Sequence, residues 1–90
     1  MQIMGTNRWE RDIPEDRLVK EALRFADAVK AQGIAQLRDA CIATDQKLLW
    51  CTWDTEDFEA LEAAFADLNE RSGLISELTP IEAFYPEPAR

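Results

Sequence analysis

Histidine is absent from this chain of 90 residues. It is the commonest general base and transition-metal ligand of proteins, and the usual proximal ligand of haem. Catalysis by a Ser-His-Asp or Cys-His arrangement is therefore excluded. The two cysteines, Cys41 and Cys51, have no second pair and match no zinc-binding spacing. We expect no metal site.

Long runs of apolar or basic residues are also missing. No apolar stretch approaches the ~20 residues of a membrane-spanning helix, and residues 1–8 lack the charged head and apolar run of a signal peptide. The 18 acidic and 10 basic residues give a formal net charge of −8. This charge repels nucleic-acid phosphates and anionic lipid surfaces. We therefore expect a cytoplasmic protein with reduced cysteines that binds neither nucleic acid nor membranes.

What is present is typical of a single globular domain over residues 1–90. Hydrophobic residues make up 47% of the chain, which is ordinary for a folded protein and too high for disorder. A chain of this length buries only about 60–65% of the surface that its unfolded form exposes. Association with a second copy would add to that burial.

Two helices are expected from apolar residues at helical spacing. The first covers residues 13–32, with Asp12 placed to cap its start and Gly33 to follow its end. The second starts in the acidic segment 54–57 and ends at Gly73. Its apolar stripe consists of Phe58, Leu61, Phe65 and Leu68.

Four strands are expected around these helices, at residues 1–9, 34–43, 47–54 and 74–85. Pro80 interrupts the last one and predicts an edge strand or a bulge, because proline has no N–H for a ladder bond. The loop at residues 44–46 contains no glycine, which disfavours a tight type I′ turn. A three-residue loop that begins at Asp45 would set Cys41 opposite Cys51, and a four-residue loop that begins at Thr44 would set it opposite Trp50. The sequence leaves both registers open.

The order βαββαβ predicts an α+β, ferredoxin-like sandwich, in which a four-stranded antiparallel sheet carries both helices on one face. The third strand is apolar at its odd positions and also at Leu48 and Trp50, whereas a solvated face should be polar. We therefore expect a homodimer that packs through the bare sheet face. The alternative is a monomer whose bare face is partly covered by the C-terminal tail, including Phe84 and Tyr85.

With this architecture the chain resembles the dimeric α+β barrel superfamily, which includes antibiotic-biosynthesis-type monooxygenases and stress-responsive barrel proteins. Residues 48–61, LLWCTWDTEDFEAL, are similar to its strand-Trp-acidic-helix junction. Residues 1–8, MQIMGTNR, resemble the opening strand of its haem-degrading members, whose pocket asparagine and tryptophan match Asn7 and Trp53. Those enzymes hold haem iron with a helical histidine that this chain lacks. We therefore expect no haem and no other cofactor.

Such a sandwich can enclose a cleft for a small ligand between the sheet and the first helix. The residues expected to contribute to it are Asn7, Trp9, Arg38, Trp50, Trp53 and Tyr85. Arg38 would anchor a carboxylate or phenolate, or it would pair with Asp54. The alternative for the tryptophans is plain packing, and for Asn7 a hydrogen bond at a strand end. No catalytic residue is assigned, since Asp39 would act as a general base only if buried.

The leading hypothesis is a stand-alone dimeric barrel protein that binds a small apolar or aromatic molecule. One alternative is a cofactor-independent monooxygenase or isomerase acting on an aromatic or polyketide-like substrate, with Asn7, Trp53 or Arg38 as polarising contacts. Another is an interaction module without a ligand. The sequence leaves open whether the protein is an enzyme.

Overall fold

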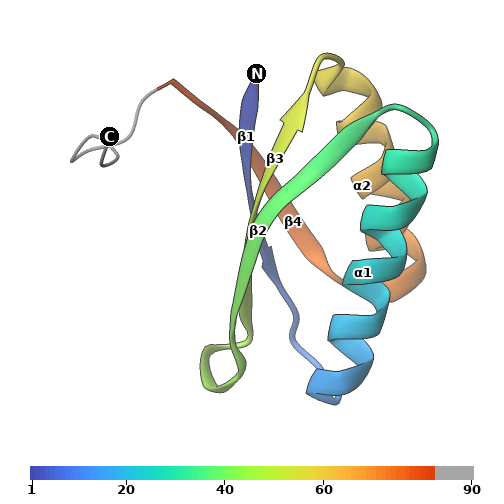
Figure 1. The fold of residues 1–90 in the computed structure, drawn as a ribbon. Coiled ribbons are helices and arrows are strands. Elements are labelled where there is room, and N and C mark those ends of the chain that lie inside the picture. The colour runs from blue at the N-terminus through green and yellow to red at the C-terminus, as the bar shows by residue number, and fades with distance from the viewer. Residues whose placement is uncertain (83–90) are drawn as a thin grey trace.

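The computed structural model describes residues 1–82. Its elements, in chain order, are β1 (Gln2–Arg8), α1 (Glu15–Ala31), β2 (Ala35–Ala43), the 3-10 turn η1 (Thr44–Gln46), β3 (Leu48–Thr55), α2 (Phe58–Ser72) and β4 (Ile75–Ile81). The strands form one antiparallel sheet in the order β2-β3-β1-β4. Both helices cover the same face of this sheet (Figure 1). The predicted ferredoxin-like α+β sandwich is therefore confirmed. In the described part of the chain, neither helix combines the length and apolar character needed to traverse a membrane.

The first helix begins without the side-chain cap that the sequence predicts. Pro14 is the N-cap residue, its carbonyl oxygen accepts the Leu18 N–H at 3.1 Å, and no side chain caps this helix. Proline already has the φ that a helix start needs, and the Asp12 carboxylate lies 3.1 Å from Nζ of Lys47 instead. The cap prediction for Asp12 is therefore wrong. Gly33 follows the helix with a φ of 71°, as predicted.

Both ends of the second helix are capped, and the capping residues lie where the sequence predicts the helix to begin and to end. Asp57 Oδ1 accepts the Ala60 N–H at 3.0 Å, which places a carboxylate at the positive end of the helix dipole. Gly73 ends the helix with a φ of 79°, in the left-handed region where a side chain would be strained.

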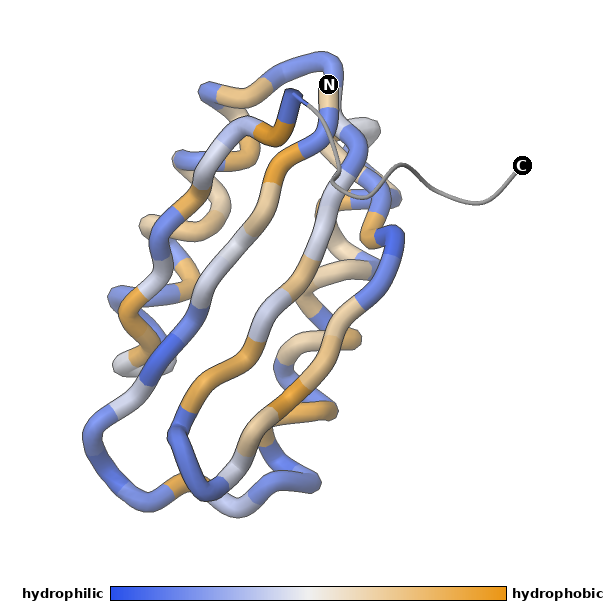
Figure 2. Tube along the Cα trace, turned by 90° about the vertical axis from the view of Figure 1, so that its left-hand side faces the viewer, coloured by the Kyte–Doolittle hydropathy of each residue, from blue (hydrophilic) through white to orange (hydrophobic). Residues whose placement is uncertain are grey.

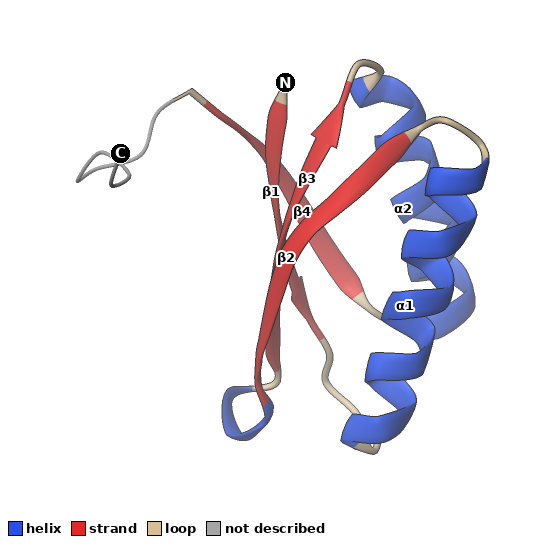
Figure 3. Ribbon diagram, viewed as in Figure 1, coloured by secondary structure: helices blue, strands red, loops and turns tan. Residues whose placement is uncertain are grey.

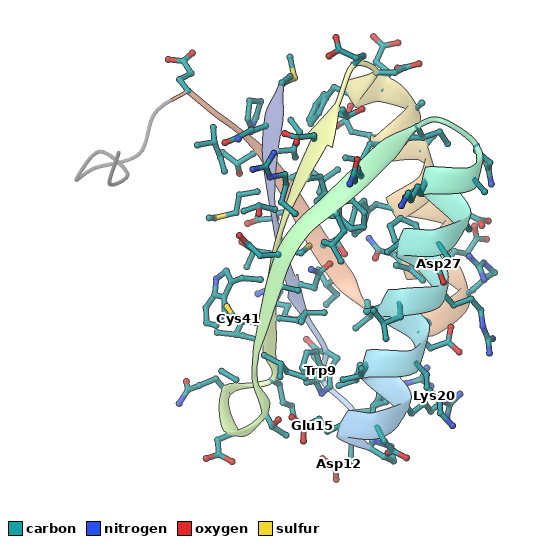
Figure 4. The ribbon with its side chains drawn as sticks, in the orientation of Figure 1. Trp9, Asp12, Glu15, Lys20, Asp27 and Cys41 are labelled. Carbon is teal, nitrogen blue, oxygen red and sulfur yellow. The ribbon has the colours of Figure 1, made fainter. Side chains whose placement is uncertain are left out.

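The hairpin between β2 and β3 has a four-residue loop (Figure 3). It consists of η1 followed by Lys47, which has a left-handed φ of 52°. Of the two registers that the sequence leaves open, this one sets Cys41 opposite Trp50. Cys41 is exposed on the side of the sheet away from the helices (Figure 4), whereas Cys51 is buried, and both thiols are free.

A bulge interrupts β2. The register shifts between Leu37 and Asp39, which leaves Arg38 without a partner in β3. The extra residue moves the alternation of side chains by one position. As a result, Leu37 and Ala40 both lie opposite residues of β3 that face the helices, and Arg38 and Asp39 are both exposed.

The last strand, β4, lies at an edge of the sheet, as Pro80 predicts. Pro80 is opposite Ile3 of β1, and no other described strand pairs with β4. Edge strands tolerate proline, because one of their two sides makes no ladder bonds.

The helices cover one face of the sheet and leave the other face bare. Under the helices, β1 and β3 contribute buried residues, namely Ile3, Gly5, Asn7, Cys51, Trp53 and Thr55. The opposite side, here termed the open face, is turned toward the viewer in Figure 2, with the helices behind the sheet. On the open face β3 carries half-buried Leu48 and Trp50. β3 therefore presents large apolar side chains on both faces.

Candidate ligand-binding site

Two of the predicted site residues, Asn7 and Trp53, come together beneath the helices. They are 2% and 3% exposed and lie on neighbouring strands, β1 and β3. Trp9 is also buried, just beyond the end of β1 and between the sheet and α1 (Figure 4). Tyr85 lies outside the described residues.

The other two predicted site residues, Arg38 and Trp50, lie on the open face, so the sheet separates them from Asn7 and Trp53. Nη1 of Arg38 is 2.7 Å from Oδ2 of Asp54. Arg38 thus forms the predicted ion pair with Asp54, which was the alternative to its anchoring a ligand carboxylate or phenolate. This hydrogen bond raises the pKa of the Arg38 guanidinium. Asp39 is exposed and accepts the Thr52 hydroxyl at 2.8 Å. Its environment does not supply the burial that a general base would need.

Asn7 is at the centre of a buried polar network. Its Nδ2 donates to the Leu49 carbonyl oxygen at 3.1 Å and to Cys51 Sγ at 3.5 Å. Its Oδ1 accepts the Ser76 hydroxyl at 2.6 Å, and the same hydroxyl lies 2.8 Å from Oδ1 of Asn69. Both amide N–H groups of Asn7 are thus engaged within the protein. The network joins β1 to β3, β4 and α2, which is the structural role expected of a buried, fully bonded amide.

The thiol of Cys51 accepts a further hydrogen bond, from Nε1 of Trp53 at 3.0 Å. Burial raises the pKa of the Cys51 thiol, and the bonds from Trp53 and Asn7 oppose that rise. The neutral thiol is a poor nucleophile. Gly5 makes room for it, because a Cβ at that position would lie 2.8 Å from the sulfur. Cys51 is therefore a packing and acceptor group.

Trp53 belongs to a cluster of three aromatic rings. Its ring centroid lies 5.7 Å from that of Phe25 in α1 and 5.6 Å from that of Phe65 in α2, both in edge-to-face geometry. The centroids of the two phenylalanines are 4.6 Å apart. Edge-to-face contacts of this kind add to the stabilisation from burial. The cluster holds both helices against β3.

A small cavity of about 30 Å³ lies beside these residues, between the sheet and the helices. Asn7, Cys51, Trp53 and Phe25 are among its lining residues. This volume admits a water-sized guest and no aromatic molecule.

The cavity adjoins an apolar groove of about 220 Å³ between α1 and β2, which we term the α1/β2 groove. The groove and the cavity share Leu18, Ala22, Leu37, Ala40 and Leu49. On the outer rim, Val19 and Leu23 of α1 are 43% and 55% exposed. Exposed apolar side chains that border a concave surface are typical of binding sites.

Val19 and Leu23 are not among the site residues predicted from the sequence, although the sequence contains a signal for them. Both lie beside the main apolar stripe of α1, so the apolar arc of this helix is wider than the surface that the sheet covers. An arc of excess width indicates a second contact or a ligand. Among residues 1–82, no three His, Cys, Asp or Glu side chains are placed to hold a metal ion.

The burial difference between the two thiols predicts a difference in reactivity. At about pH 8, we expect iodoacetamide to modify Cys41 at least about tenfold faster than Cys51 in the folded protein. Mass spectrometry of the modified protein checks the order of labelling.

The pKa of the Cys51 thiol also makes stability depend on pH. Because this pKa is raised in the folded state, the contribution of the neutral thiol to the free energy of unfolding is complete below the ordinary pKa of 9.0. That contribution is lost as the pH rises through the raised pKa.

The matched control for this labelling is the Cys41→Ser variant, which retains Cys51 alone. It should remain unlabelled until denaturant is added. Equal rates for the two thiols in the folded protein would contradict the buried position of Cys51.

These features define the chain as a ferredoxin-like α+β sandwich with an apolar groove beside its first helix. No protein-family model matches the chain, and no curated protein matches it either.

Proposed function

We propose that the protein binds a small apolar or aromatic molecule in the α1/β2 groove, and that it acts as a homodimer of the dimeric α+β barrel kind. The observation that carries the binding proposal is the groove itself, which is apolar, borders on exposed Val19 and Leu23, and continues toward the interior cavity. Burial of an apolar guest there would remove this surface from water, at about 25 cal/mol per Å².

The contacts of the polar candidates favour binding over catalysis. The amide of Asn7 is bonded within the network, the indole of Trp53 is bonded to a thiol, and Arg38 pairs with a carboxylate on the other side of the sheet. A monooxygenase or isomerase would need such a group to be free and aimed at its substrate. The groove also favours a ligand-binding protein over a ligand-free interaction module.

The dimer proposal is supported by the apolar residues of the open face. Trp50 and Leu48 of β3 are half-buried there, beside exposed Cys41 and, further along the sheet, Ile75, which is 37% exposed. A two-fold copy packed against this face would cover them with an identical surface. Full burial of each large side chain contributes about 1.5–3 kcal/mol.

The binding proposal is tested with N-phenyl-1-naphthylamine, a neutral fluorescent apolar probe. We expect saturable fluorescence enhancement with the native chain, and a dissociation constant at least about fivefold higher in the Val19→Gln/Leu23→Gln variant, which loses apolar contact area. The two residues are 43% and 55% exposed, so their replacement should leave the fold intact.

Ile75→Gln provides the matched control, because it replaces an exposed apolar residue on the open face. Its probe affinity should equal that of the native chain. The absence of saturable binding, or equal loss of binding in both variants, would refute the α1/β2 groove as the site.

A further inference from the structure

A second hollow, of about 370 Å³, lies on the opposite flank of α1 from the α1/β2 groove. It is formed by the segment before α1, the first half of α1 and the end of α2. We term it the arginine cleft, because its charged lining consists of Arg11, Arg17, Arg24 and Arg71, with Asp12 and Glu21.

The arginine cleft contrasts with the charge of the whole protein. The chain has a formal net charge of −8 and only 10 lysine and arginine residues, yet four guanidinium groups and two carboxylates line this cleft. With Asp67, the ion-pair partner of Arg71, the group has a formal net charge of +1. A concave surface with one excess sign of charge concentrates ligands of the opposite sign.

Much of the hydrogen-bonding capacity of these arginines is unused. Arg11 is fixed by a 2.9 Å bond from Nη2 to the Ser72 carbonyl oxygen, and Arg71 uses its Nε for Asp67 at 3.1 Å. Nη1 of Arg24 lies 3.5 Å from Oε1 of Glu21. Within residues 1–82, Arg17 has no carboxylate within ion-pair distance, that is, 4.0 Å. Since a guanidinium carries five N–H donors, several donors remain free along the rim.

We propose that the arginine cleft binds the phosphate group of a small phosphate monoester. A planar guanidinium can donate two parallel N–H bonds to the oxygens of one phosphate. The positive net charge of the cleft attracts a phosphate monoester, which carries about −1.5 to −2 at pH 7. Leu18, Leu68 and Leu74 also line the cleft and offer apolar contact to the organic part of the ligand.

The arginine cleft shares one lining residue, Leu18, with the α1/β2 groove and differs from it in all the others. The outer rim of the groove is formed by Val19 and Leu23, whereas Arg17, Glu21 and Arg24 of the same helix border the cleft. The neutral probe of the groove carries no phosphate, so either site can fail its test while the other is supported.

The test is isothermal titration calorimetry of the full chain with phenyl phosphate and inorganic phosphate, and with benzoate as a carboxylate of similar ring size. We expect saturable binding of phenyl phosphate that weakens with added salt. The Arg17→Gln/Arg71→Gln variant should bind phenyl phosphate at least about tenfold more weakly, because it lacks two guanidinium groups that would donate N–H bonds to the phosphate. Arg11 is left unchanged because it caps α2.

The matched control is Arg8→Gln, which removes the same kind of charge from an exposed strand end outside the cleft. It should bind phenyl phosphate within about twofold of the native chain, because Arg8 does not line the cleft and the charge of an exposed side chain is screened by salt. Arg17→Lys serves as a second variant, which keeps the charge and loses the fork, and circular dichroism verifies each fold.

Three results would overturn the proposal. They are no saturable binding of either phosphate, equal weakening in the cleft variant and in Arg8→Gln, and benzoate binding as tight as that of phenyl phosphate. Tighter binding of phenyl phosphate than of benzoate, with a loss confined to the cleft variants, would support it.

Discussion

Replacing Trp50 by lysine is expected to leave the fold intact and to abolish self-association. Trp50 is half-buried on the open face, in the middle of β3, and lies on the side of the sheet away from the helices, whereas the next residue, Cys51, is buried under them. In the proposed dimer, a lysine would place an unpaired charge in an apolar interface. Loss of a central tryptophan together with such a charge should raise the dissociation constant at least about 100-fold.

Light scattering or sedimentation across a dilution series measures this effect. The native chain should be dimeric at micromolar concentration, and the variant should have the monomer mass of 10.3 kDa. Leu23→Lys is the matched control, since it adds the same charge at an exposed apolar position outside the open face. A native chain that is monomeric at every concentration would refute the dimer and leave the groove proposal standing.

The largest loss of stability is expected from Trp53→Ala. The change removes a side chain that is 3% exposed, both edge-to-face contacts and the hydrogen bond to Cys51. Truncation of a buried aromatic residue costs about 3–5 kcal/mol in the free energy of unfolding. This is a large part of the 5–15 kcal/mol available to a typical domain, and a chain of 90 residues lies at the lower end of that range.

Urea denaturation at one fixed protein concentration measures the loss. Leu23→Ala is the control, because that side chain is 55% exposed and its removal should cost less than about 1 kcal/mol. Trp53→Phe, which retains an aromatic ring, should fall between the two. Similar midpoints for Trp53→Ala and Leu23→Ala would show that the aromatic cluster does not hold the helices to the sheet.

The cysteine pair shows where sequence patterns stop being informative. The two strands of the hairpin are predicted by composition, but their register depends on one loop residue, Lys47, which adopts a left-handed conformation. A shift of one residue moves every side chain of a strand to the other face. The sequence therefore allowed Cys41 opposite either Cys51 or Trp50, and only the folded hairpin selects the second.

The candidate site shows the same limit over longer distances. Asn7 and Trp53 were predicted together and lie on adjacent strands, but Arg38 and Trp50 are on the other side of the sheet. On β2, the bulge at Arg38 shifts the alternation so that Arg38 and Asp39 are both exposed. No local signal in residues 35–43 indicates that bulge.

The sequence by itself determined the order of the elements, the glycine that ends α2 and the edge position of the strand that contains Pro80. These features follow from local chemistry, in which helical periodicity, a permissive φ or a missing N–H acts within a few residues. The tertiary structure alone decided the hairpin register, the bulge and the two hollows on either side of α1. Those depend on segments far apart in the chain being brought together: Arg17 and Arg71 line one hollow and Leu23 and Ala40 the other, and no local pattern encodes this arrangement.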